Sequence, residues 1–331
     1  MRVAQSPFLI PALMVAYVGM AVTIPSLRAD LLSVDAKGYA VLYEGTGGHN
    51  LQITNVQVNG NIGVGGTGVV QDNGPSVIAG GLDFSAANTG QFHDNNGSNV
   101  GPFTVNYNVA AVTKALTFVN DLNADWGSQA GTGVSINGNS TIDASNGMLD
   151  TIIVDGQSET AEVFNVTSFS LGNGQTVTIN DAAGNNVVFN FPSSLGNINF
   201  QGDVVLNGLT ADQLLWNMVG VGKHFDINNN ASSFGSGLSS PAAQGIFLNP
   251  NGEMSSVNAN IIGRFFGGDS QDMQIVSGTT LITPPTGGGG GGGGGSVPEP
   301  SSVVLLSTAV VAFAVSRGKK LSPGRKIVNS I

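Results

Sequence analysis

The chain has 331 residues, 49 glycines, no cysteine and a formal net charge of −10, and only 10% of its residues are charged. An acidic chain repels phosphate backbones, which excludes nucleic acid as a partner, and the lack of cysteine excludes disulfides and thiol nucleophiles. Between residues 30 and 300 there are 21 acidic residues and four basic ones, a net charge of −17. The four bases are Lys37, Lys114, Lys223 and Arg264. They are too few to hold an anionic polysaccharide by charge.

Residues 1–29 have the pattern of a signal peptide. Arg2 supplies a short positive region, an uncharged apolar stretch covers residues 8–24, and Ala29 offers a small residue for cleavage before Asp30. We therefore predict an N-terminal signal helix that is removed on export. The alternative is an uncleaved N-terminal anchor.

Residues 30–283 form the predicted exported domain, which is long enough for one sizeable core. Short runs of Val, Ile, Leu, Phe and Thr alternate with polar residues, for example at residues 51–54 and 176–179, and Gly or Asn separates them every few residues. This period of two predicts many short strands. Because the Gly and Asn punctuation is uniform, it favours a coiled solenoid over a sandwich of longer strands.

One segment of the domain has helical periodicity. A stretch without Gly or Pro runs from Asn108 to Trp126, and apolar residues recur in it at steps of three and four. This pattern predicts one amphipathic helix of about five turns, with Asn108 as its N-cap and Gly127 as its stop. The predicted apolar face comprises Val109, Val112, Leu116, Val119, Leu122 and Trp126.

After this helix, a pattern of aliphatic, aromatic, Asn and apolar residues occurs three times, at 163–166, 188–191 and 215–218, with starts 25 and 27 residues apart. If each copy is the same strand of successive coils, the aromatic residues stack inside about 4.8 Å apart and the asparagines form an amide ladder on the opposite face. The predicted stack is Phe164, Phe189 and Trp216, and the predicted ladder is Asn165, Asn190 and Asn217.

Together, the strand-rich opening at residues 39–42 and 58–64, the single helix, the repeats and the segments 245–252 and 260–264 resemble the choice-of-anchor A and ice-binding-protein-like β-helix families. The similarity spans most of residues 31–283. It implies a mainly β fold, a right-handed parallel β-helix (solenoid) with one long α-helix along its side. It also implies an extracellular role.

The C-terminal end carries a separate signal. Within a predicted Pro/Gly-rich linker (residues 284–297), nine glycines form a flexible spacer. Residues 298–331 then contain a Pro-Glu-Pro motif, an uncharged apolar run at 303–315 and a basic tail. The motif is Pro298, Glu299 and Pro300, and the basic residues that orient the run in a membrane are Arg317, Lys319 and Lys320.

This ordered set resembles the PEP-CTERM sorting signal of Gram-negative bacteria. The resemblance implies that residues 303–315 are a transmembrane helix that anchors the chain transiently in the inner membrane. It also implies that an exosortase releases the protein to the cell surface or extracellular matrix. The run would span roughly 20 Å, less than the ~30 Å of a hydrocarbon core, so flanking serines must be drawn in or the bilayer thinned. An ordinary single-span anchor is the alternative.

Patterns that indicate catalysis or metal binding are incomplete. The glycines of residues 63–68 match a dinucleotide fingerprint, but no helix pattern follows them. Residues 226–237 begin like a calcium loop but lack its glycine and its glutamate. Asp121 and Asp125 lie one helical turn apart and are expected to be solvated. The three histidines, His49, His93 and His224, are isolated from one another in the sequence. We therefore predict no catalytic residue, no metal and no cofactor.

The predicted function is that of a non-catalytic surface or extracellular-matrix protein associated with exopolysaccharide. The alternative is an ice-binding protein or a glycan-binding adhesin. An ice-binding face needs a regular array of small or Thr side chains, and Thr176 and Thr178 are the only clear pair. A third class is a polysaccharide-active β-helix enzyme. A lyase requires cations to stabilise an enolate-like anion, and the domain has almost no bases.

Overall fold

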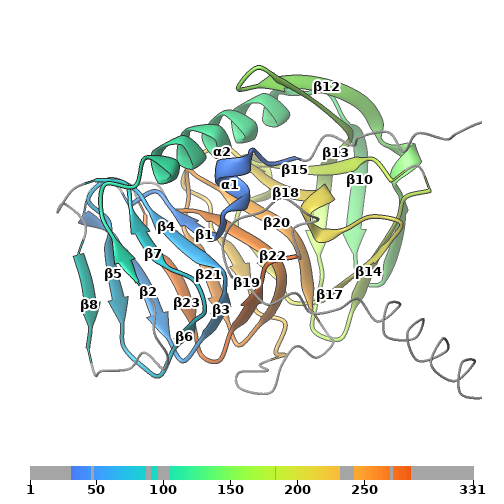
Figure 1. Cartoon of the computed structure of the whole chain (residues 1–331). Helices are drawn as coiled ribbons and strands as arrows, with labels where there is room; N and C mark the ends of the chain where they lie inside the picture. The colour runs from blue at the N-terminus through green and yellow to red at the C-terminus, as the bar shows by residue number, and fades with distance from the viewer. Residues whose placement is uncertain are drawn as a thin grey trace, which may run out of the picture.

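The computed structural model shows a mainly β chain with parallel sheets, as predicted (Figure 1). The predicted signal peptide, the sorting signal and all of the linker except Pro284 lie outside the residues that it describes. Those residues are 31–45, 48–86, 91–95, 104–182, 184–231, 242–268 and 271–284.

The described strands form three sheets, and sheet A is the largest. Its main path, in spatial order, is β10 (Thr132–Asn137), β13 (Gln157–Ser170), β15 (Asn186–Pro192), β18 (Leu214–Val219), β20 (Ala243–Asn249), β22 (Asn260–Gly267), β1 (Tyr39–Tyr43), β4 (Asn61–Val64), β7 (Leu82–Phe84) and β9 (Val105–Asn106). Beside this path, β12 pairs with β13, and β24, β3 and β6 continue from β22: β12 (Met148–Val154), β24 (Thr280–Ile282), β3 (Gln57–Asn59) and β6 (Val77–Ile78).

Sheets B and C form the other sides of the molecule. Sheet B runs in the spatial order β16 (Ile198–Phe200), β19 (Phe225–Ile227), β21 (Met254–Val257), β23 (Met273–Val276), β2 (Asn50–Thr54), β5 (Val69–Asp72) and β8 (Gln91–Asp94). Sheet C contains β11 (Ser140–Asp143), β14 (Thr176–Asn180) and β17 (Asp203–Asn207). The short 3-10 helices are η2 (Ala144–Asn146), η3 (Ser193–Leu195) and η4 (Ala211–Gln213).

Successive strands visit the sheets in turn. The chain passes from β14 in sheet C to β15 in sheet A, β16 in sheet B and then β17 in sheet C again, and each strand pairs in parallel with the strand one coil further on. Within β14 the residues are alternately half-buried and buried. The period of two in the sequence therefore places every second side chain inside the coil.

Asparagine and glycine mark the corners of these coils. Asn55, Asn230, Asn258 and Ser277 have positive φ angles at a corner that follows strands of sheet B. Asparagine tolerates this conformation better than most residues. Its amide also links neighbouring coils, since Asn258 Nδ2 donates to Asn230 Oδ1 at 2.7 Å. The Gly and Asn punctuation is thus a consequence of corners that stack in register.

The spatial order of sheet A differs from the order of the sequence. The C-terminal strand β22 lies between β20 and the N-terminal strand β1, and it pairs in parallel with both. The chain therefore starts in the middle of the stack, builds outward to β9, crosses to the far end at β10 and coils back to meet its own beginning (Figure 1). The N-terminal and C-terminal coils are neighbours, which the repeat alone did not predict.

Helix α2 (Ala110–Ser128) makes the crossing, along the outer face of sheet A (Figure 1). The predicted amphipathic helix is confirmed, and its predicted apolar face is buried or half-buried. Both predicted ends are wrong. Asn108 has a φ of +59°, a left-handed turn, and Val109 is the N-cap. Gly127 lies inside the helix, where a Cβ would lie 3.1 Å from Val219 Cγ1, so the glycine permits close packing on β18.

The shorter helix α1 (Val34–Lys37) lies beside α2 at the beginning of the described chain (Figure 1). Ser33 caps it, accepting a hydrogen bond from Ala36 N–H at 3.2 Å. The two helices and the outer face of sheet A enclose a second apolar cluster, separate from the core inside the coils.

The predicted aromatic stack is confirmed. Phe164 pairs with Phe189 and Phe189 with Trp216 in the strand registers, with ring centroids 5.1 and 4.8 Å apart. The stack also continues beyond the predicted repeat, because Phe247 and then Phe265 occupy the same register position. All five side chains are buried in one core cluster.

The three predicted asparagines share one register position, and two of them form an amide ladder under α2. Asn217 Nδ2 donates to Asn190 Oδ1 at 2.9 Å, and both residues are buried. Their other polar atoms bind the helix: Asn190 Nδ2 donates to the Trp126 carbonyl at 2.7 Å, and Asn123 Nδ2 donates to Asn217 Oδ1 at 2.6 Å. The ladder therefore holds the C-terminal end of α2 on the sheet.

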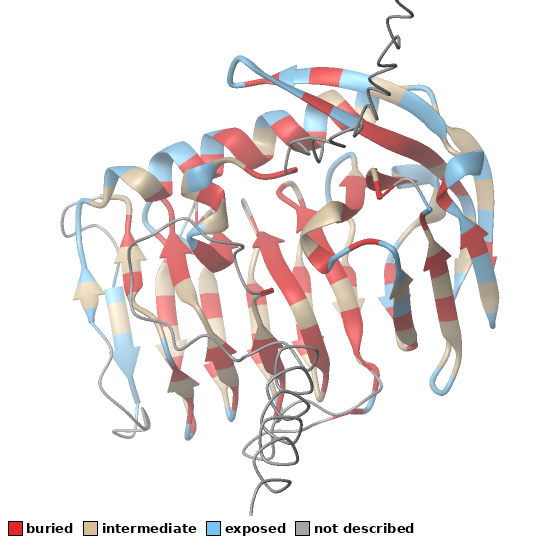
Figure 2. Ribbon diagram, turned by 45° about the vertical axis from the view of Figure 1, so that its right-hand side comes forward, coloured by how far each residue is buried: buried red, intermediate tan, exposed pale blue. Residues whose placement is uncertain are grey.

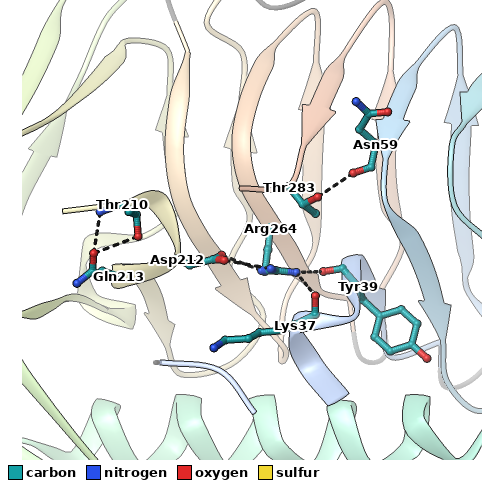
Figure 3. A network of polar contacts seen from close by, with 8 residues as sticks. All are labelled: Lys37, Tyr39, Asn59, Thr210, Asp212, Gln213, Arg264 and Thr283. Atoms are coloured by element: carbon teal, nitrogen blue, oxygen red, sulfur yellow. Dashed lines mark hydrogen bonds and ion pairs between the residues drawn. The ribbon is translucent and has the colours of Figure 1, made fainter. Parts of the chain in front are cut away.

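A buried arginine joins the two ends of the described chain (Figure 3). Arg264, in β22, is fully buried and forms an ion pair with Asp212 of η4, with an Nε–Oδ1 distance of 2.8 Å. Its Nη1 donates to the carbonyls of Lys37 and Tyr39 at 2.7 and 2.6 Å. Each of these groups comes from a different part of the sequence, so the guanidinium links β22, η4 and the N-terminal segment.

In the part of the chain that the structure describes, no helix has the length and apolar character to cross a bilayer. The transmembrane helix predicted at residues 303–315 lies outside that part.

Candidate functional site

Among the described residues, helices α1 and α2 pack on sheet A and leave the outer face of sheet B uncovered. The strand residues that pack against α2 come from sheet A, including its strand β12. In sheet B, the side chains that alternate with the core residues stay partly exposed, as in β2 and β5 (Figure 2). A surface of this kind presents rows of side chains, one residue from each strand.

The strand registers define a central polar row on this face. Each member lies opposite the next across a parallel pair of strands. In spatial order the central row is Asn199, Asp226, Ser255, Gln274, Gln52, Gln71 and His93. It extends over every strand of sheet B, including the junction between the C-terminal strand β23 and the N-terminal strand β2.

A second row lies two residues earlier along the strands and is polar at every position except Val69 of β5. In spatial order its members are Asn197, His224, Glu253, Asp272, Asn50, Val69 and Gln91. Here His224 Nδ1 lies 3.3 Å from Glu253 Oε2, and His49 Nδ1, just before β2, lies 3.4 Å from Asp272 Oδ1. Asn50 N–H donates to the same Asp272 oxygen at 2.8 Å. All three histidines of the sequence therefore lie along sheet B, although they are isolated in sequence.

A shallow hollow of about 190 Å³ lies between the two rows, where β23, β2 and β5 are adjacent. Gln71 Nε2 donates to Asn50 Oδ1 at 3.3 Å across it. The side-chain amides of Gln52 and Gln274 make no hydrogen bond with any residue that the structure describes. The lining residues are Asn50, Gln52, Gln71, Asp272 and Gln274.

Neither row contains Lys or Arg. Asp226, Glu253 and Asp272 give the face a negative character, and Ser255 Oγ donates to Asp226 Oδ1 at 2.6 Å. Among the described residues there is no group of three or more His, Asp or Glu side chains that could hold a metal ion. Asp226, the first residue of the incomplete calcium loop, is thus part of the polar row.

Two buried carboxyl groups have raised pKa values, but they do not form a catalytic pair. Burial raises the pKa of Asp72 in β5, and a hydrogen bond from Ser76 Oγ at 2.9 Å opposes the shift. Burial also raises the pKa of Glu162 in β13, where Asn185 Nδ2 donates to Oε1 at 3.2 Å. β5 and β13 lie near opposite ends of the stacked strands, so neither carboxyl group can serve the other as an acid–base partner.

Two of the other predicted site residues lie away from sheet B. Thr176 and Thr178 are on sheet C, where Thr178 is opposite Thr141 on one side and Val205 on the other. Sheet C is three strands wide, so this threonine array is small. The sorting-motif and basic tail residues lie outside the described part of the chain: Pro298, Glu299, Pro300, Arg317, Lys319 and Lys320.

The chain belongs to the ice-binding-like adhesive domain family, whose model matches residues 29–275. The ice-binding-protein-like part of the predicted resemblance is therefore confirmed. The match does not reach the predicted sorting signal.

Several solved structures are similar to the chain. An ice-binding protein from an Antarctic Biological Consortium is 15% identical, with a TM-score of 0.46, and the alignment covers 78% of this chain and 92% of that one. The ice-binding protein of Antarctomyces psychrotrophicus is 14% identical, with a TM-score of 0.45, and the alignment covers 78% of this chain and 100% of that one. The ice-binding protein of an Arctic yeast is 10% identical, with a TM-score of 0.46, and the alignment covers 80% of this chain and 100% of that one. No curated protein sequence matches the chain.

Proposed function

We propose that the protein is an exported, non-catalytic adhesin of the bacterial cell surface or extracellular matrix, and that it associates with exopolysaccharide through the polar face of sheet B. The observation that carries the proposal is the uninterrupted polar row across all strands of that sheet. The family is described as adhesive, which agrees with a binding role.

The chemistry of the face supports adhesion by many weak contacts. Amide, hydroxyl and carboxylate groups both donate and accept hydrogen bonds, as sugar hydroxyls do. Each contact exchanges protein–water for protein–sugar hydrogen bonds and contributes about 0.5–1.5 kcal/mol. A polymer that meets several strands at once gains affinity through effective concentration. The regular stacking of the coils supplies this repetition.

An ice-binding role is the second candidate, because the family is described as ice-binding-like. The composition of sheet B weighs against it. Ser255 stands beside Gln274, and Asp226 beside Asn199, so neighbouring side chains in the row differ in length and charge. On sheet C the threonines are interrupted as well, because Asp203 lies opposite Thr176 and Val205 lies opposite Thr178.

The location rests on the sequence of both ends. The Pro-Glu-Pro motif at 298–300, the apolar run at 303–315 and the basic residues behind it support export, transient anchoring in the inner membrane and release by an exosortase.

We also propose that the coil is right-handed, because about 98% of crossover connections between parallel strands of one sheet are right-handed.

The sorting proposal predicts that the mature surface protein lacks the apolar run. Cleavage near residues 298–300 would leave the body and the glycine spacer together and remove the basic tail. Mass spectrometry of the surface fraction tests this, with the membrane fraction as the control that contains the precursor. Peptides from residues 303–319 in the mature protein would contradict release.

The adhesion proposal predicts that the full-length chain is retained on exopolysaccharide isolated from the producing cells. The retained polymer should show no new reducing ends, because no catalytic role is proposed. A column of the same support, blocked with albumin and carrying no polysaccharide, is the control for non-specific retention. Passage of the chain without retention would contradict adhesion, and thermal hysteresis in its solutions would favour ice binding.

A further inference from the structure

We propose that the hollow across β23, β2 and β5 is a subsite for one sugar unit of an uncharged polysaccharide. This inference rests on the proposed function and names both its binding residues and its ligand class. The hollow spans the junction where the C-terminal coil meets the N-terminal coil, because Gln274 lies opposite Gln52 in the register of β23 and β2. The site therefore exists only when the two ends of the domain are packed together.

The two glutamines supply the recognition chemistry. Their side chains are half-buried, so part of each is already held by its neighbours. Neither amide has a hydrogen-bond partner among the described residues, and each offers a carbonyl acceptor and an NH₂ donor. Adjacent hydroxyls of a pyranose ring are complementary to such a group, because one hydroxyl can donate to the amide carbonyl while the other accepts from the amide NH₂.

Asp272 provides a fixed acceptor at the edge of the hollow. Its Oδ1 atom is held by Asn50 N–H at 2.8 Å and lies 3.4 Å from His49 Nδ1. A hydroxyl that donates to a carboxylate forms a charge-assisted hydrogen bond, which is stronger than a neutral one. Because the carboxylate is already oriented, less conformational entropy is lost when the sugar binds.

The charge of the face selects against acidic sugars. Uronic acids, sulfates and phosphates would lie beside Asp272, with Asp226 and Glu253 on the same face and no Lys or Arg in either polar row. Like charges that are brought together without a counter-ion are destabilising. An uncharged polymer meets no such repulsion.

The spacing of the strands sets the direction of the polymer. Neighbouring parallel strands are about 4.8 Å apart, which is close to the length of one pyranose unit. A chain that crosses the strands therefore meets a new set of polar side chains at each unit, from Gln274 to Gln52 to Gln71. No Phe, Tyr or Trp belongs to either polar row, so each unit binds weakly and length determines the affinity.

Affinity electrophoresis of the full-length chain in mild detergent tests the subsite, with dextran, hydroxyethylcellulose and galactomannan as uncharged probes and alginate as the acidic one. The double variant Gln52→Met/Gln274→Met keeps the side-chain volume and removes both amides. We expect at least one uncharged polymer to retard the wild type, and the double variant to bind it about five-fold or more weakly. Alginate should retard neither.

Gln57→Met is the matched control, because Gln57 is a half-buried strand glutamine in β3 of sheet A, away from the hollow. It should bind like the wild type, and equal unfolding midpoints would show that the variants are folded. Retardation of the double variant equal to that of the wild type, stronger binding of alginate, or no binding of any uncharged probe would each overturn the subsite.

The two proposals fail in different ways. If the wild type and the double variant are both retained on the producing cell's exopolysaccharide, the subsite is wrong and adhesion stands. If the wild type itself is not retained there, the proposed function fails.

Discussion

Replacement of Arg264 by alanine should lower the free energy of unfolding by about 3–5 kcal/mol, because removal of one partner from a buried ion pair leaves the other uncompensated. Asp212, whose side chain is 15% exposed, would lose both of its hydrogen bonds to the guanidinium. The carbonyls of Lys37 and Tyr39 would lose their donors as well (Figure 3). The junction between the N-terminal and C-terminal coils would then open first.

Denaturant unfolding of three variants separates the charge from the packing. Arg264→Met keeps most of the volume and should still be strongly destabilised, while Arg264→Met/Asp212→Leu should recover part of the loss because no buried charge is left unpaired. Lys114→Met removes an exposed cation from α2 and should change stability by less than about 0.5 kcal/mol. Equal effects of Arg264→Met and Lys114→Met would show that the buried network does not stabilise the junction.

The repeat after the helix could be predicted from the sequence because it is local. Phe164, Phe189 and Trp216 belong to successive coils, so their spacing along the chain is one turn of the coil and their register follows directly. The asparagine ladder followed from the same alignment. Its burial did not follow, because it depends on α2, which precedes the repeat in the sequence and packs over it.

The order of the coils could not be predicted in the same way. The contact of β22 with β1 joins residues more than two hundred positions apart, and no repeat spans that separation. Arg264 was a signal that could have been used. A lone arginine within the apolar strand of residues 260–267 requires a buried partner, and the structure places that partner at Asp212.

The candidate face was missed for a related reason. The alternation in residues 51–54 predicts that Gln52 points outward from a strand, but its neighbours in space decide what it can bind. Those neighbours are Gln274 and Gln71, and the first of them lies at the other end of the domain. The same applies to His49 and Asp272, which are far apart in sequence and paired in the structure.

The aromatic stack should dominate the stability of the core, so Phe189→Ala is expected to cost about 3–5 kcal/mol. Phe189 is fully buried between Phe164 and Trp216, with centroid distances of 5.1 and 4.8 Å. Its removal leaves a cavity between two rings that the strand registers hold apart. Because the backbone ladders fix the spacing of the coils, the rings cannot collapse into the cavity.

Denaturant melts of Phe189→Ala, Phe189→Leu and Ile153→Ala measure this contribution. The leucine variant should lose about 1–2 kcal/mol, since it retains much of the volume but not the ring stacking, which is worth ~0.5–1.5 kcal/mol per pair. Ile153 is 71% exposed on β12 and serves as the control, with an expected loss below about 0.5 kcal/mol. A loss for Phe189→Ala as small as that of Ile153→Ala would mean that the coils are held by their ladders and by the apolar cluster under α2, with little contribution from the stack.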